Sequence, residues 1–165
     1  MTAKRGTKGV LSHVGDRGAA RMVDVGGKAP TARHAKAGGE IRMSRAAWVA
    51  VRDNTTKKGD VLAVARLAGI QAAKRTAELI PLCHPLPLSH VDVALELVAR
   101  PPMVRVEVSV ATVAPTGVEM EALTAASVAL LTVYDMVKSA DRRMRIGAVR
   151  LLEKSGGRSG HFRAR

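Results

Sequence analysis

The sequence has one cysteine, three aromatic residues and no long apolar run, and each shortage excludes a class of protein. The single cysteine, Cys83, permits no internal disulfide, which is typical of a reducing compartment. With only Trp48, Tyr134 and Phe162 as aromatics, the chain lacks a stacking platform for single-stranded nucleic acid. No apolar stretch approaches membrane-spanning length, and the N-terminal residues lack the apolar run of a signal peptide. We expect a cytoplasmic protein without a membrane partner.

Common catalytic and metal-binding signatures are also missing. The sequence contains no CxxC, HxxxH or HExxH spacing, and no Walker, GxGxxG or GxSxG motif. Standard nucleotide-binding, hydrolase and zinc-site patterns are therefore excluded as guides to the function.

The net charge of +13 first suggests a nucleic-acid-binding protein, but most of the excess lies at the two ends. Residues 1–21 hold five Lys or Arg against one acid, and residues 154–165 hold four with no acid. The segment between them has 18 basic and 13 acidic residues, which leaves only +5. Charged ends are more often solvated than functional. A basic nucleic-acid-binding protein remains the alternative function, and we expect no nucleic-acid partner.

The 165 residues fit one domain, which we place at 21–154 between a basic flexible tail at 1–20 and a Gly/Ser/Arg tail at 155–165. Strict alternation of apolar and polar residues predicts two strands, over 89–98 and 103–110, that pair as a hairpin. Apolar, proline-free segments predict helices over 59–80 and 117–140, with a short helix from the N-cap Ser44 to Arg52 and a final strand over 146–154. The pairs Gly26-Gly27 and Gly38-Gly39 predict turns. Long helices on one face of an antiparallel sheet give an α+β sandwich.

The stretch ELIPLCHPLPLSH places Cys83 beside His84 among three prolines. Adjacent side chains of an extended segment point to opposite sides, so these two residues do not readily form a thiolate–imidazolium pair. Three interpretations remain open. They are a metal site together with His90, a small buried thiol beside a hydrogen-bonded histidine, and a rigid loop that holds a planar polar ligand.

A second group of candidates lies on the helix over 117–140. Asp135 and Lys138 share one face, whereas Glu121 lies about 21 Å away along the helix axis. These groups line either one elongated ligand or a site shared between subunits; the plain alternative for Asp135 and Lys138 is a surface ion pair. Lys58 precedes the helix over 59–80, where free N–H groups and ammonium charge favour phosphate, or where the lysine is simply solvated.

The order of these segments and their amino-acid sequences resemble those of a known protein family. RMVDVGGK, KKGDVLAVARLAGIQAAKRTAELIPLCHPLPLSH, TGVEMEALTAASVALLTVYDMVKSAD and RLLEKSGGRSG are similar to the molybdenum cofactor biosynthesis protein C family, the cyclic pyranopterin monophosphate synthases. The resemblance covers about residues 10–160. It implies a ferredoxin-like fold and an enzyme that converts a cyclised dihydro-GTP into cyclic pyranopterin monophosphate with loss of diphosphate.

The resemblance also implies roles for particular residues. Asp135 is then the active-site acid, with Lys58 and Lys138 as catalytic lysines. The implied substrate-binding positions are Leu82, Cys83, His84, Met120, Glu121, Arg33, Asp24 and Lys154. His34 stands where an acid commonly follows the motif arginine, which leaves Arg33 without a neighbouring carboxylate to orient it. Val137 stands where a cysteine often precedes the motif lysine.

The resemblance further implies a homohexamer, a trimer of dimers, with active sites at subunit interfaces. The expected ligand is a small nucleotide-derived substrate. No metal or cofactor is demanded by the sequence, and magnesium is expected only as a companion of the triphosphate.

Overall fold

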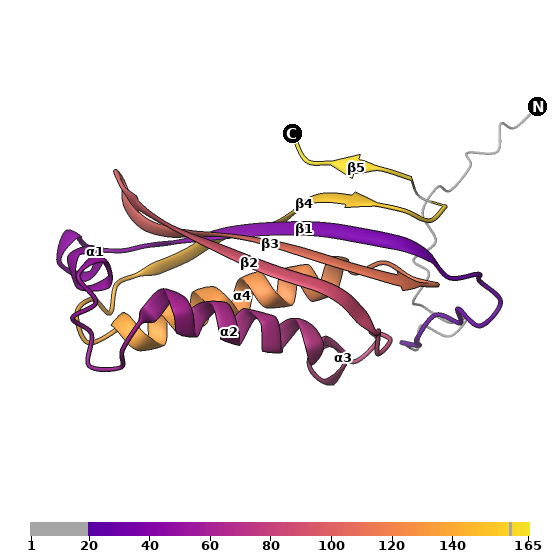
Figure 1. Cartoon of the computed structure of the whole chain (residues 1–165), viewed down its shortest axis with the longest axis horizontal. Coiled ribbons are helices and arrows are strands. Elements are labelled where there is room, and N and C mark those ends of the chain that lie inside the picture. Colours follow the sequence, from indigo (N-terminus) through magenta and orange to yellow (C-terminus); the bar gives the residue numbers. More distant parts are fainter. Residues whose placement is uncertain (1–19, 159) are drawn as a thin grey trace, which may run out of the picture.

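The computed structural model describes residues 20–158 and 160–165, so almost all of the tail expected at 1–20 lies outside the described residues. The elements are β1 (Thr31–Arg42), α1 (Arg45–Arg52), α2 (Val61–Lys74), α3 (Thr76–Leu79), β2 (Leu88–Ala99), β3 (Pro102–Ala114), α4 (Glu119–Val137), β4 (Arg145–Ser155) and β5 (Phe162–Arg163). The strands form one antiparallel sheet in the order β2-β3-β1-β4-β5, with α2 and α4 on one face (Figure 1). This is the βαββαβ arrangement of the ferredoxin-like fold, and the predicted α+β sandwich is confirmed.

The predicted hairpin forms from β2 and β3, and its alternation sets the two faces of the sheet. Val104, Val106 and Val108 point into the core and are at most 1% exposed, whereas Arg105 and Glu107 between them face solvent. Because successive side chains of a strand point to opposite faces, this pattern leaves one face apolar for the helices.

The prediction of a turn at Gly38-Gly39 is wrong, although the turn at Gly26-Gly27 is present. Both residues of the Gly38 pair lie inside β1, next to register shifts in its pairing with β4. A Cβ on Gly38 would lie 2.9 Å from Leu152 Cδ1, and one on Gly39 would lie 2.8 Å from Leu130 Cδ1. Glycine is needed here because neighbouring side chains approach the strand closely, not because the chain reverses.

The single helix predicted over 59–80 is also wrong at its C-terminal end. It begins with the N-cap Asp60, whose carboxylate accepts a hydrogen bond from Ala63 N at 3.0 Å, but α2 ends at Lys74 and α3 follows. The buried Thr76 hydroxyl donates to the carbonyls of Ala72 and Ala73 at 3.2 and 3.0 Å. Hydroxyl bonds of this kind bend a helix, and here they mark the break.

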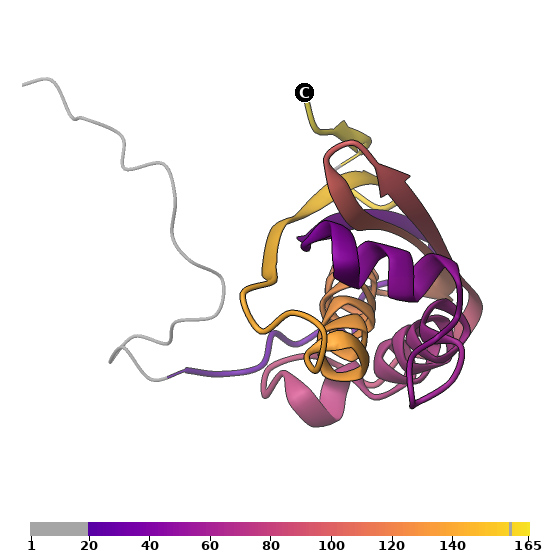
Figure 2. The same ribbon diagram turned by 90° about the vertical axis from the view of Figure 1, so that its left-hand side faces the viewer.

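Helix α4 is the core helix of the fold. Ala122, Ala125 and Ala129 are completely buried against α2 and the sheet, and the two helices lie side by side beneath the strands (Figure 2). With 19 residues and a mean hydropathy of 1.4, α4 has the length and composition of a membrane span, so the sequence-based exclusion of any such stretch was too strong. Its buried contacts identify it as the centre of a packed domain instead.

The contact between α2 and α4 depends on one glycine. A Cβ on Gly69 would lie 3.2 Å from Ala125 O, 3.2 Å from Val93 Cγ2 and 3.4 Å from Ala129 Cβ, so any added atoms must push α2 away from α4. The small residues on both helices therefore set how closely the helices pack.

We predict that Gly69→Val lowers the free energy of unfolding by about 1–3 kcal/mol through overpacking. The matched control is Gln71→Val on the exposed side of α2, which should cost less than about 0.7 kcal/mol through helix propensity alone. Urea denaturation followed by circular dichroism measures both changes. Equal losses in the two variants would contradict the packing argument.

Candidate active site

Two lysines and one aspartate meet at the C-terminal end of α4. The Lys58 ammonium contacts the Asp135 carboxylate and also donates to the Asp135 carbonyl at 3.3 Å. Lys138 Nζ lies 2.7 Å from the other carboxylate oxygen. All three side chains are about half exposed, so this lysine–aspartate cluster (Lys58, Asp135 and Lys138) lies at the surface.

A tight turn brings Lys58 to the helix end from a distant part of the chain. The turn runs from Thr56 to Gly59, with Gly59 N donating to Thr56 O at 3.2 Å and the Thr56 hydroxyl donating to Gly59 O at 2.7 Å. Gly59 has a φ of +89°, a conformation that other residues adopt only with strain. Lys138 needs no such turn, because it caps α4 and lies three residues after Asp135.

The position of Asp135 runs against the helix dipole. A carboxylate in the last turn faces the negative end of the helix, where cations are favoured instead. Its hydrogen bonds to Lys138 and then to Lys58 compensate, and they lower the pKa of Asp135 from 3.8 to about 2. The carboxylate therefore stays ionised through the neutral range and fixes the positions of two ammonium groups.

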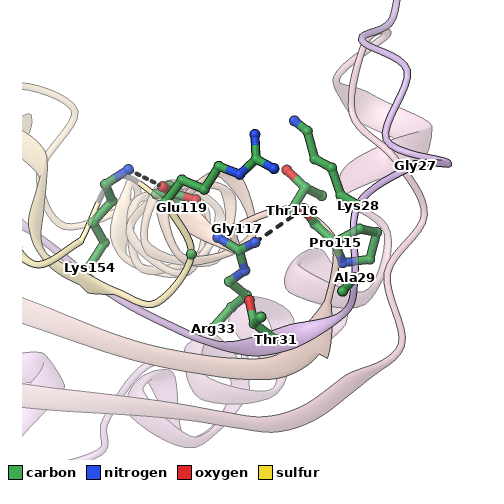
Figure 3. Close-up of a pocket in the computed structure, with 12 residues that line it drawn as sticks. Gly27, Lys28, Ala29, Thr31, Arg33, Pro115, Thr116, Gly117, Glu119 and Lys154 are labelled. Atoms are coloured by element: carbon green, nitrogen blue, oxygen red, sulfur yellow. Dashed lines mark hydrogen bonds and ion pairs between the residues drawn. The ribbon is translucent and has the colours of Figure 1, made fainter.

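A cationic cavity lies at the opposite end of α4. It has a volume of about 790 Å³ and collects four basic side chains from two separate parts of the chain. These are Lys28, Arg33, Lys154 and Arg158, and Glu119 is the one carboxylate among the lining residues. Figure 3 shows Lys28, Arg33 and Lys154 around the cavity, with Lys154 joined to Glu119. Such a concentration of cations suits a polyanion.

Arg33 is oriented by backbone carbonyls rather than by a carboxylate. Its guanidinium donates to Ala114 O at 3.3 Å and to Pro115 O at 3.2 Å, where β3 ends. A Cβ on Gly157 would overlap this guanidinium, so the glycine leaves the room that the arginine occupies. His34, which follows Arg33, instead contacts the Ser109 hydroxyl at 2.9 Å. The two backbone carbonyls thus orient the Arg33 guanidinium, for which the sequence showed no neighbouring carboxylate.

A second, more apolar pocket of about 310 Å³ adjoins the cationic cavity, and the two share Lys28, Thr116, Gly117 and Glu119. Five of the predicted substrate-binding residues line this neighbouring pocket: Leu82, Cys83, His84, Met120 and Glu121. The polar groups and apolar walls of this pocket suit a flat heterocycle, whereas the cationic cavity suits phosphate.

Burial changes the acid–base behaviour of two groups in this neighbouring pocket. Glu121 is only 4% exposed, and burial raises the pKa of its carboxyl. Burial, and then the Glu121 charge, raise the pKa of the Cys83 thiol. A raised pKa disfavours the thiolate, so Cys83 is a poor nucleophile here.

No group of three potential metal-binding side chains occurs among the described residues. Cys83 and His84 both line the neighbouring pocket, which is the placement that the ligand-holding interpretation requires.

Apart from Asp24, the predicted site residues therefore fall into two separate clusters. Asp135 follows Glu121 by 14 residues on one continuous helix, which corresponds to about 21 Å. Asp24 joins neither cluster. Its exposed carboxylate accepts a hydrogen bond from Gly26 N at 2.8 Å, although Val23 and Val25 beside it line the neighbouring pocket.

Sequence reasoning missed three residues that line the cationic cavity. Lys28, Arg158 and Glu119 are absent from the residues predicted from the sequence. Lys28 follows the Gly26-Gly27 turn and Arg158 follows Gly156-Gly157. A lysine or arginine directly after a glycine pair was the available signal.

Comparison with known proteins shows close relatives along most of the chain. A model of the MoaC family matches residues 22–157. The chain is 61% identical over 154 residues to the cyclic pyranopterin monophosphate synthase of Methylobacterium sp. (strain 4-46), covering 93% of this chain and 96% of that protein. The proteins of the same name from Methylobacterium nodulans and Roseiflexus sp. (strain RS-1) are 60% and 57% identical, with 93% and 92% of this chain and 96% of each relative covered.

The lysine–aspartate cluster predicts an unusual titration. Carboxyl carbon NMR should place the Asp135 midpoint at about 2 rather than 3.8, and either Lys138→Met or Lys58→Met should raise it. Because the pKa is lowered in the folded chain, the contribution of Asp135 to stability is complete above its ordinary pKa and is lost as the pH falls through about 2.

Arg105→Met is the matched control for this titration, since it removes a similarly exposed cation on the far side of the sheet. A wild-type midpoint at the ordinary value would show that the cluster does not persist in solution.

Proposed function

The chain belongs to the MoaC family, and from that premise we propose how its two clusters divide the family's reaction. The protein is an enzyme, a cyclic pyranopterin monophosphate synthase of molybdenum cofactor biosynthesis, and hence a lyase. The observation that carries the proposal is the pairing of Asp135 with two lysines at one end of α4, opposite a cationic cavity at its other end.

The proposed substrate is the cyclised dihydro-GTP, (8S)-3',8-cyclo-7,8-dihydroguanosine 5'-triphosphate. Its triphosphate lies in the cationic cavity on Arg33 and Lys154, with Lys28 and Arg158 adding charge. Its base lies in the neighbouring pocket against the loop of Cys83 and His84. Because the cavity and this pocket share lining residues, one ligand can occupy both.

The lysine–aspartate cluster performs the proton transfers. Opening the purine-derived ring and building the pterin moves protons at nitrogen and carbon, and closing the cyclic phosphate expels diphosphate. Lys58 and Lys138 act as the acid and the base, and Asp135 holds their nitrogens next to each other. The cations of the cavity stabilise the charge that develops on the departing diphosphate. Magnesium, where present, arrives with the triphosphate as part of the substrate.

The active site is composite, and a second copy of the chain completes it. The cavity and the lysine–aspartate cluster lie at opposite ends of one buried helix, and its packing prevents them from approaching each other. A neighbouring subunit brings its cluster to the cavity of the first. Helix α2 supports such an assembly, because Leu67 is 63% exposed and Val64 41% exposed on its outer side. We propose a homohexamer, a trimer of dimers, that works in the cytoplasm without membrane or nucleic-acid partners.

Lys138→Met should lower kcat by about 10²–10⁴-fold, the usual contribution of a positioned acid or base. The assay incubates the purified enzyme with the cyclised dihydro-GTP and measures the pterin and diphosphate. Lys36→Met on the sheet is the matched control and should keep its activity. Near wild-type turnover in a normally folded Lys138 variant would reject the proton-transfer role.

Subunit complementation tests the composite site. Lys138→Met removes the cluster and Arg33→Met damages the cavity, so each variant alone should be nearly inactive. When the two are co-expressed, random assembly should leave about one site in four intact, and activity should return to that extent. Lys58→Met co-expressed with Lys138→Met should not recover, because both changes damage the same cluster. Equal behaviour of the two pairs would show that each site lies within one chain.

A further inference from the structure

An ion pair lies inside the cavity that is assigned to the triphosphate. Lys154 Nζ lies 3.0 Å from Glu119 Oε1, and the two side chains are only 27% and 29% exposed. The lysine comes from β4 and the glutamate is the first residue of α4. A cation of the anion site therefore already contacts an anion of the protein itself (Figure 3).

A carboxylate in this position works against anion binding. It repels the phosphate groups of a ligand, and it forms an ion pair with a lysine that these phosphates would otherwise contact. The start of α4 favours a negative charge, but Glu121, two residues later, already supplies one there. The local structure also makes room for Glu119, because a Cβ on Gly117 would overlap its carboxylate. Helix stability alone does not explain a glutamate that is folded back into the cavity.

We propose that Glu119 is a built-in competitor of the phosphate chain for Lys154, and that the return of this ion pair assists the release of diphosphate. The inference rests on the proposed function, which places the triphosphate in this cavity. When the substrate binds, Lys154 exchanges the carboxylate for a phosphate oxygen. After the reaction Glu119 recovers Lys154, which weakens the hold of the cavity on the product.

The competition predicts the direction of a mutational effect. Glu119→Gln removes the competing charge but keeps the size of the side chain, so diphosphate should bind more tightly. The gain should be about fivefold, which is the size of a partly screened ion pair. If Glu119 instead positioned Lys154 for the phosphate, the same change would weaken binding. The sign of the change therefore separates competition from positioning.

The experiment measures inorganic diphosphate binding to the full-length assembly by calorimetry, in magnesium-free buffer. Glu119→Gln should lower Kd about fivefold, and diphosphate should inhibit turnover more strongly to a similar extent. Glu107→Gln is the matched control, since it removes the same charge from an exposed pair with Lys36 on the sheet. An unchanged or weaker affinity in the Glu119 variant overturns the inference.

A double-mutant cycle tests whether Glu119 acts on diphosphate binding through Lys154. In a Lys154→Gln background, Glu119→Gln should lose most of its effect on diphosphate affinity, because the contested cation is gone. An undiminished effect would mean that Glu119 acts by general repulsion, and the competition would be rejected.

Failure of the proposed function is distinguishable from failure of this inference. Diphosphate binding requires no turnover, so an inactive wild type that binds diphosphate would refute only the assigned reaction. A wild type that binds no diphosphate would refute the cavity assignment and the inference together.

Discussion

The packing of α4 between the sheet and α2 is the constraint on which both clusters depend. Ala122, Ala125 and Ala129 have no exposed surface, and Gly69 of α2 lets the two helices approach closely. A helix held on so many sides does not bend or slide without loss of core contacts. Its length therefore becomes the fixed distance between the cavity and the lysine–aspartate cluster. The proposed assembly assigns the task of joining them to a second copy of the chain.

The two ends of α4 use the same dipole in opposite ways. At its start, Glu119 and Glu121 lie where negative charge is favoured. At its end, Asp135 lies where it is disfavoured, and it is stabilised only because Lys58 and Lys138 contact it. A carboxylate that needs two cations for its stability also holds those cations in place. The same contacts therefore stabilise the Asp135 carboxylate and position the two lysine ammonium groups.

The fold was predictable where one local pattern decided the outcome. Alternation in β2 and β3 predicted the hairpin correctly, because a strand with one buried face must alternate. Prediction failed where side-chain packing or a buried hydrogen bond decided the outcome. Gly38-Gly39 looks like a turn until Leu152 and Leu130 are seen to pack against it. The break after α2 depends on the buried hydroxyl of Thr76, whose choice of carbonyl partners no propensity reveals.

For the site, the sequence by itself determined the chemical groups, their family and their order along the chain. It also determined the spacing of Glu121 and Asp135, because the rise per residue of a helix is constant. Only the tertiary structure decided which groups meet. It placed Lys58 against Asp135, added Lys28 and Arg158 to the cavity, and directed Glu119 toward Lys154. Contacts between residues far apart in the chain depend on how layers pack, and packing is a property of the whole core.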